Sequence, residues 1–261
     1  MFKGKISKGI SLFTLVCFVL FQTSAYSLPQ GAQVVSGQVA VNTSGSNMDI
    51  NISTDKAITN WQSFSIAQPE SVSFHQLSSS SVALNRVVGA DPSSILGRLS
   101  ANGKIFLVNP NGIVFGKTAV VDTAGLIAST LNISDQDFLA GRYIFKGKGG
   151  SVINQGYISS PGGYVALLGS SVENSGIIEA TLGSIALASG EAITLNLDPQ
   201  GLIQVVIDKA TSQNLEHKTS AVKNTGTLSA SGGKVILTAK TLDNIFDKAV
   251  NNEGVIEAKS L

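Results

Sequence analysis

Residues 152–158 read Val-Ile-Asn-Gln-Gly-Tyr-Ile, and this stretch decides the fold because the chain repeats its pattern three more times. The pattern is an apolar residue, Asn two positions later, Gly two positions after that, and a closing apolar residue. A short turn and a second pattern, Gly-x-apolar-x-Leu, follow each of the first three copies. The four copies occupy residues 152–158, 172–178, 222–228 and 250–256.

The spacing of these copies predicts the architecture. Their asparagines stand at positions 154, 174, 224 and 252, so the intervals are 20, 50 and 28 residues. A period near 20 with alternating apolar positions is typical of one coil of a β-solenoid. The longer intervals then contain a coil plus an insertion. Successive coils pair through backbone hydrogen bonds about 4.8 Å apart and bury their Val, Ile and Leu side chains. The sequence therefore predicts an all-β, single-stranded β-solenoid.

Stacked coils place equivalent asparagines above one another, where their side-chain amides can form a ladder. The recurrence of these asparagines is explained by stacking alone, without a bound ligand. We therefore interpret four residues as a structural ladder at the coil turns: Asn154, Asn174, Asn224 and Asn252.

Three segments depart from the repeat. Residues 198–207 predict a hairpin that lies outside the solenoid. Residues 134–139 predict a short helix, because Ser134 can cap its first turn and Asp137 follows three residues later. An exposed solenoid end is an open sheet edge, so a cap is required, and we expect residues 28–74 to form it.

The N-terminus predicts a cleaved leader. Basic residues precede an apolar run over residues 10–21, which is too short to span a bilayer, and small residues follow this run. We place the signal peptide at residues 1–27, with cleavage after about residue 25 or 27, and the domain at residues 28–261. Such a leader implies the general export machinery and signal peptidase as partners.

The amino-acid composition narrows the class of protein further. The single cysteine, Cys17, lies inside the leader, so the exported chain has no thiol for a disulfide. Charged residues make up 13% of the chain and hydrophobic residues 43%, a balance that argues against disorder. The formal net charge of +1 gives no electrostatic footprint for nucleic acid. The chain is therefore expected to fold by backbone pairing and core packing, without a nucleic-acid partner.

A dense motif precedes the repeats: residues 109–113 read Asn-Pro-Asn-Gly-Ile. Pro presets φ and Asn-Gly favours positive φ, so the motif predicts a β-turn between two apolar strands. With AITNWQSF at 57–64, VALNRV at 82–87 and SSILGRL at 93–99, it resembles the filamentous-haemagglutinin N-terminal domain. This family is also called the haemagglutination activity or two-partner secretion domain. The resemblance runs from about residue 28 to at least residue 145, and the repeats continue it.

The resemblance implies a right-handed parallel β-helix with an N-terminal cap and extrahelical strands. It also implies export through the periplasm and recognition by the POTRA modules of an outer-membrane TpsB-type β-barrel transporter. The product would be a secreted or surface-associated adhesin of a Gram-negative bacterium, with the domain seeding β-helix folding outside the cell. An upstream Asn-Pro-Asn-Leu motif of the family is absent, since residues 42–45 read Asn-Thr-Ser-Gly. The resemblance assigns five residues to the secretion motif: Asn109, Pro110, Asn111, Gly112 and Ile113.

Two further positions are typical of the family, Trp61 and Asn85, and we expect Asn85 to be a buried amide that stabilises a turn. For Asn109 and Asn111 two roles are open: they hold the turn in place, or they contact the transporter. Both roles predict lost secretion on mutation. Circular dichroism and binding by purified variants would separate them.

An enzyme is the first alternative, because β-helices also carry polysaccharide lyases and hydrolases. Such sites need clustered carboxylates with a basic residue or calcium. Here the acidic residues are scattered, and Glu173 aligns with Ile153 and Lys223 rather than with another acid. Neither histidine, His75 or His217, has a partner at metal-ligand spacing. We therefore predict no catalytic residue, no metal and no cofactor.

A self-standing adhesin or carbohydrate-binding β-helix is the second alternative. The chain stops at Leu261 within a repeat, which predicts a domain truncated at its C-terminus. Host or bacterial surface glycans would then be bound by regions beyond this chain. Only a glycan-binding or cell-binding assay separates an adhesin from a secretion domain.

Overall fold

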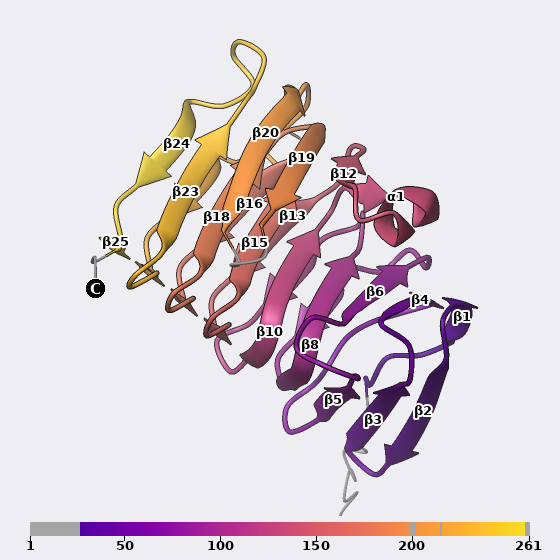
Figure 1. Ribbon diagram of the computed structural model, residues 1–261. Coiled ribbons are helices and arrows are strands. Elements are labelled where there is room, and N and C mark those ends of the chain that lie inside the picture. The colour runs from indigo at the N-terminus through magenta and orange to yellow at the C-terminus, as the bar shows by residue number, and fades with distance from the viewer. Residues whose placement is uncertain (1–26, 199–201, 215, 259–261) are drawn as a thin grey trace, which may run out of the picture.

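The computed structural model describes residues 27–198, 202–214 and 216–258. These residues form an elongated stack of coils that runs from the N-terminal strands at one end to the C-terminal strands at the other (Figure 1). The predicted leader lies, apart from Ser27, outside the described residues. Within the described part of the chain, no helix is long and apolar enough to cross a membrane.

The coils contribute strands to three faces, and all pairs between strands of successive coils are parallel. Face A is a separate sheet of six strands. Its strands are β7 (Ser93–Ile95), β9 (Ile113–Phe115), β13 (Ser151–Asn154), β16 (Ser171–Asn174), β21 (Ser220–Asn224) and β24 (Lys248–Asn252).

Faces B and C belong to one sheet because β8 (Arg98–Val108) and β10 (Val120–Ser129) turn the corner between them. The first part of β8 pairs with β5 on face B, and its second part pairs with β6 on face C. The other face B strands are β3 (Asn47–Ile52), β5 (Ser71–His75), β14 (Tyr157–Ser159), β17 (Ile177–Glu179), β22 (Thr227–Ser229) and β25 (Val255–Glu257). The other face C strands are β4 (Lys56–Trp61), β6 (Val82–Val87), β15 (Tyr164–Gly169), β18 (Ser184–Ser189) and β23 (Lys234–Ala239).

The register between coils confirms the predicted repeat. Val152 pairs with Val172, which pairs with Val222, so identical motif positions stack. These three side chains are fully buried in the interior core, where the inward residues of all three faces meet. The 20-residue interval is one coil, and the longer intervals contain insertions between β18 and β21 and between β23 and β24. The chain is a parallel β-helix, as predicted.

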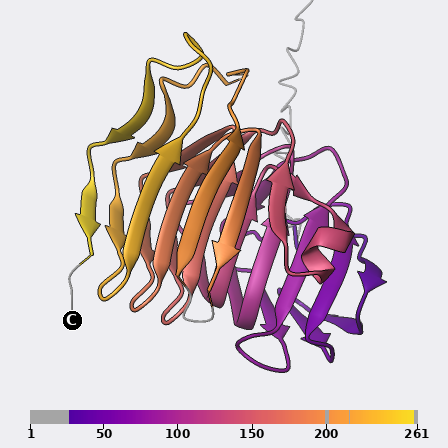
Figure 2. The ribbon, with the colours of Figure 1, turned by 45° about the horizontal axis from the view of Figure 1, so that its top comes forward.

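A third sheet lies outside the helix, in the antiparallel order β11-β12-β19-β20. The predicted hairpin at 198–207 is confirmed and begins earlier than expected, with β19; its tip, residues 199–201, lies outside the described residues. The strands are β11 (Asn132–Ile133), β12 (Tyr143–Lys146), β19 (Ala192–Leu197) and β20 (Ile203–Lys209). Figure 2 shows β12 and helix α1 (Asp135–Leu139) beside this hairpin, on the outer side of the coils.

This outer layer covers face C with a second hydrophobic core. The Phe106 ring on face C lies 5.5 Å from the Phe138 ring of α1 and 6.3 Å from the Phe145 ring of β12. Because face C is packed on both surfaces, every residue of β15 and β18 is buried. Helix α1 confirms the predicted short helix, since the Ser134 hydroxyl accepts a hydrogen bond from the Asp137 amide at 3.1 Å.

The cap is shorter than the predicted range of 28–74. Only β1 (Gln33–Ser36) and β2 (Val39–Ser44) pair in the antiparallel direction, with β4 and β3 respectively. From Asn47 onward, β3 already pairs with β5 as a parallel coil. The prediction was wrong because this first coil lacks the Asn-x-Gly motif, although its alternate residues are buried like those of later coils.

Arg86 on β6 fastens the outer layer to the helix. Its guanidinium donates to the Ile133 carbonyl and the Asp135 carboxylate, both at 2.7 Å, and to the Asn132 and Asn60 side chains at 2.9 and 3.2 Å. Only 12% of its side chain is exposed. The planar fork of Arg satisfies four acceptors at once, which a Lys ammonium cannot do in the same geometry.

We expect Arg86→Lys to lower the free energy of unfolding by about 1–3 kcal/mol, because acceptors next to a largely buried charge lose their donors. Urea unfolding followed by circular dichroism measures this. Arg142→Lys is the matched control, since Arg142 is 52% exposed and pairs only with Asp137 on the surface. Equal losses in the two variants would show that Arg86 is not the fastening residue.

Candidate functional site

The Asn-Pro-Asn-Gly turn joins β8 on face C to β9 on face A, so it is a corner of the helix. The Gly112 amide donates to the Asn109 carbonyl at 3.1 Å, which confirms the predicted β-turn. Pro110 occupies the second position, where its fixed φ suits the turn. Of the Asn-Gly pair, only Gly112 has a positive φ, at +124°. Residues 109–113 are called the motif corner below.

Asn109 holds the motif corner from inside. It is fully buried, and its amide nitrogen donates to the Asp91 carbonyl and the Ser93 hydroxyl, each at 3.0 Å. Its side-chain oxygen accepts from the Asn111 amide at 3.0 Å. The side chain thus ties the turn to the corner of the preceding coil, and it presents no surface to a partner.

Pro110 and Asn111 are the exposed members of the motif, while Gly112 and Ile113 are buried. The Asn111 side chain donates to the Gly89 carbonyl at 2.9 Å and to the Asn109 side chain at 3.2 Å. It is therefore held in one orientation at the surface. The motif divides into an inner part that builds the turn and an outer pair that solvent or a partner can reach.

Trp61 and Asn85 form a buried pair on β4 and β6 of face C. The Trp61 indole donates to the Asn85 side-chain oxygen at 3.0 Å, and both residues are 1% exposed. Asn85 lies in the middle of β6, so the predicted turn-stabilising role was wrong. Ala83 and Val87, two residues before and after it, face the interior core, so Asn85 faces this core as well. It satisfies the indole N–H, which would otherwise be buried without an acceptor.

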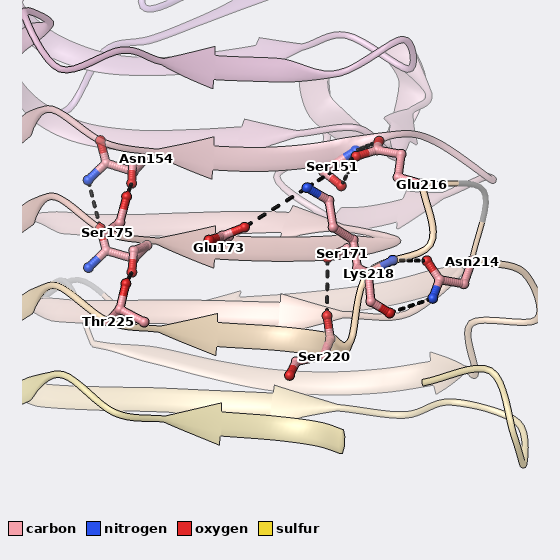
Figure 3. Close-up of polar contacts among 11 residues, drawn as sticks. Ser151, Asn154, Ser171, Glu173, Ser175, Asn214, Glu216, Lys218, Ser220 and Thr225 are labelled. Carbon is pink, nitrogen blue, oxygen red and sulfur yellow. Dashed lines mark hydrogen bonds and ion pairs between the residues drawn. The ribbon is translucent and has the colours of Figure 1, made fainter. Parts of the chain in front are cut away.

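The four repeat asparagines form a ladder along one edge of face A. Asn154 donates to Asn174 at 2.8 Å, Asn174 to Asn224 at 2.8 Å, and Asn224 to Asn252 at 2.7 Å. Figure 3 shows Asn154 on this edge. Each of the three buried ladder amides, Asn154, Asn174 and Asn224, donates to the next asparagine, so the ladder is explained without a bound ligand.

The opposite edge of face A carries a polar cluster that was not expected from the sequence (Figure 3). The connection between β20 and β21 turns back over this edge; Leu215 within it lies outside the described residues. Glu216 accepts from the Ser151 amide at 2.8 Å and from the Ser151 hydroxyl at 2.7 Å. Lys218 lies 3.7 Å from the Glu216 carboxylate and 3.9 Å from that of Glu173.

Glu191 anchors the other end of this connection. Burial alone would raise the pKa of Glu191, but hydrogen bonds from Lys209 and Ser212 and the nearby Lys148 charge outweigh it and lower the pKa to about 2. The Lys209 ammonium lies 2.8 Å from the carboxylate, and the Ser212 amide donates to it at 2.9 Å. The carboxylate therefore stays ionised at neutral pH and fixes Ser212 beside the end of β20.

Metal-ligating side chains do not cluster among residues 27–198, 202–214 and 216–258. Within them, no three His, Cys, Asp or Glu side chains are placed to hold a metal ion. His75 pairs with Asp49 at 2.9 Å on the surface. Glu173 pairs in register with Ile153 and Lys223, as predicted, so the acids do not align.

Fold and motif together define the class: a parallel β-helix with extrahelical strands and an Asn-Pro-Asn-Gly-Ile corner. The model of the TPS secretion domain family matches residues 25–261, and the chain belongs to this family. The match covers the whole domain predicted at residues 28–261.

Two curated relatives are heme/hemopexin-binding proteins of Haemophilus influenzae. One, from strain Rd, is 35% identical over 242 residues, which are 88% of this chain and 26% of that protein. The other is 33% identical over 278 residues, covering 95% of this chain and 29% of that protein. The crystal structure of the HMW1 secretion domain from Haemophilus influenzae matches with a TM-score of 0.70 and 33% identity, covering 88% of this chain and 64% of that one. The chain thus spans just over a quarter of its curated relatives.

The family gives the function at the level of the domain. The chain is a secretion domain of the two-partner secretion type, similar to that of HMW1. Such exoproteins are secreted across the outer membrane of Gram-negative bacteria, and the family implies a TpsB outer-membrane transporter as partner. The resemblance inferred from residues 57–64, 82–87, 93–99 and 109–113 is confirmed.

Proposed function

We propose that this domain, after inner-membrane export and removal of its leader by signal peptidase, carries its exoprotein to the POTRA modules of the transporter in the periplasm. Pro110 and Asn111 are the residues of the motif corner that these modules contact. One observation supports this assignment: Asn109 is fully buried and builds the turn, whereas Pro110 and Asn111 are exposed and held in a fixed orientation.

The fold also supports a role in folding outside the cell. The only cysteine is Cys17 in the leader, so no disulfide can hinder passage of an extended chain through the barrel. Each coil pairs in register with the one before it, so a folded coil is a template for the next. A folding free energy of about 5–15 kcal/mol would favour outward movement without ATP.

The test is to express the chain with and without its cognate transporter and to measure how much of the chain appears in the medium. Wild type should appear outside the cell only when the transporter is present. We expect Pro110→Ala to reduce secretion about 5- to 20-fold, corresponding to about 1–2 kcal/mol of lost recognition. Circular dichroism and thermal melting should show a nearly unchanged fold, because the ring of Pro110 is exposed and its carbonyl is retained.

Pro161→Ala is the matched control. Pro161 is also exposed at the second position of a β-turn, since the Gly163 amide donates to the Ser160 carbonyl at 3.1 Å. It lies at a different corner, between faces B and C. Secretion of Pro161→Ala at the wild-type level assigns the effect to the motif corner. Equal secretion of the two variants would refute the contact, and wild-type secretion without the transporter would refute the proposed function.

The names of the curated relatives refer to binding of heme and hemopexin by proteins about four times as long as the matched region. No described residue of this chain is assigned to that binding. Adhesion to glycans, too, would belong to regions beyond residues 28–261. We therefore confine the proposal to secretion.

A further inference from the structure

The connection that follows β20 is linked to the motif corner by two adjacent residues, Gly150 and Ser151. The Gly150 amide donates to the Pro110 carbonyl at 2.9 Å. The next residue, Ser151, is held by Glu216 through both its amide and its hydroxyl, at 2.8 and 2.7 Å. Figure 3 shows Ser151 and Glu216 in contact at the edge of face A. Glu216 thus fixes the residue adjacent to the one that supports Pro110.

Gly150 fills the space between the motif corner and this carboxylate. A Cβ atom added at Gly150 would lie 3.1 Å from the Asn111 carbonyl oxygen and 3.2 Å from Oε1 of Glu216. Both separations are tighter than ordinary van der Waals contact, so a side chain at Gly150 would displace the backbone or the carboxylate by a few tenths of an ångström. A displacement of Glu216 or of Gly150 is therefore transmitted to the backbone of Pro110 and Asn111.

The Glu216 carboxylate is itself held in place, although its side chain is 41% exposed. Asn214 donates to the Lys218 carbonyl at 2.6 Å and accepts from the Lys218 amide at 2.8 Å. It also donates to the Ile245 carbonyl at 3.1 Å, in the insertion before β24. These bonds tie Asn214 to Lys218 and to the insertion before β24, and the Lys218 ammonium lies 3.7 Å from the Glu216 carboxylate.

We propose that Glu216 is a positioning residue for transporter recognition: it holds Ser151 and Gly150 so that Pro110 and Asn111 keep the form that the POTRA modules bind. This inference rests on the proposed function. The carboxylate comes from the insertion between β20 and β21, whereas the motif corner precedes β9. The corner is therefore fully supported only after the chain as far as Lys218 has folded, and a chain folded only through β18 binds the transporter more weakly.

The test uses the mature full-length domain and purified POTRA modules of its transporter. We expect Glu216→Gln to weaken binding about three- to tenfold, because the neutral amide removes the negative charge from both hydrogen bonds to Ser151 and leaves one acceptor oxygen in place of two. Deuterium exchange at the Gly150 amide should accelerate in the same variant, while its thermal melt stays close to wild type. Ser151→Ala should have a similar effect, and the double variant should be no weaker than the stronger single variant.

Glu173→Gln is the control for charge. Glu173 lies on β16, next to the strand that carries Ser151, and also faces Lys218, but it makes no bond to Ser151. Wild-type binding by Glu173→Gln, with weakened binding by Glu216→Gln, supports positioning. Equal weakening in both variants, or wild-type binding by Glu216→Gln despite faster exchange at Gly150, overturns it. If wild type itself does not bind the POTRA modules, the proposed function fails instead.

Discussion

Gly183→Ala is expected to destabilise the domain by about 3 kcal/mol or more, the largest effect of any single methyl group that we predict. Gly183 stacks between Gly163 and Gly233 at the corner between faces B and C. A Cβ atom at Gly183 would overlap the carbonyl oxygen of Gly163, closer than real Cβ atoms approach any atom. That oxygen also accepts the Ser184 amide at 3.2 Å, so it cannot move without loss of a bond between coils.

Gly162→Ala separates this steric effect from backbone conformation. Gly162 has a φ of +72°, but no atom lies within 4 Å of its added Cβ. We expect it to cost only about 1–2 kcal/mol, the penalty of a left-handed conformation for an L-residue. Gly183 does not have a positive φ, so its cost arises from the stacked backbone alone. Urea unfolding of both variants gives the comparison, and a smaller loss for Gly183→Ala than for Gly162→Ala would mean that the coils can separate.

The same close stacking explains why so much of the fold was predictable from the sequence. Gly163, Gly183 and Gly233 stack too closely for any side chain, and the inward positions of their coils must be apolar. The same residue requirements therefore recur from one of these coils to the next. Coil length, register and the asparagine ladder follow from such local, periodic requirements. The motif turn was predictable for a similar reason, since Pro and Gly fix φ within four residues.

Features that depend on contacts between distant segments were not predictable. The Arg86 fork and the Glu216–Ser151 pair each join residues with no periodic relation. The cap boundary was misplaced because the first coil lacks the repeat motif. One signal was overlooked: residues 164–168 are Tyr-Val-Ala-Leu-Leu, apolar at every position, which is typical of a strand covered on both surfaces. It could have indicated the outer layer over face C.

The predicted turn role of Asn85 failed for a related reason. In the repeats, asparagine marks a turn because its amide meets an identical amide in the next coil. Asn85 instead faces Trp61, a partner 24 residues earlier in the chain, inside the interior core. One residue type thus serves two purposes, and only the neighbouring side chain distinguishes them.

Asn174→Ala is the other substitution with a large expected effect, a loss of about 3–5 kcal/mol in the free energy of unfolding. Asn174 is fully buried between Asn154 and Asn224. Its removal leaves the Asn154 amide without its acceptor and the Asn224 oxygen without its donor, at a cost of about 1–3 kcal/mol for each unsatisfied group. The cavity left by the side chain adds to this loss, because the stacked backbone cannot collapse into it.

Asn252→Ala tests whether the interior position matters. Asn252 is exposed and accepts one ladder bond, from Asn224 at 2.7 Å, so solvent can replace it. We expect a loss of about 1 kcal/mol or less, since the net contribution of one solvent-accessible hydrogen bond is small. Thermal melting and urea unfolding of both variants give the difference. Equal losses in the free energy of unfolding would mean that each ladder bond contributes independently of its burial. A much larger loss for Asn174→Ala means that the ladder stabilises the stack because its buried amides have no alternative partner.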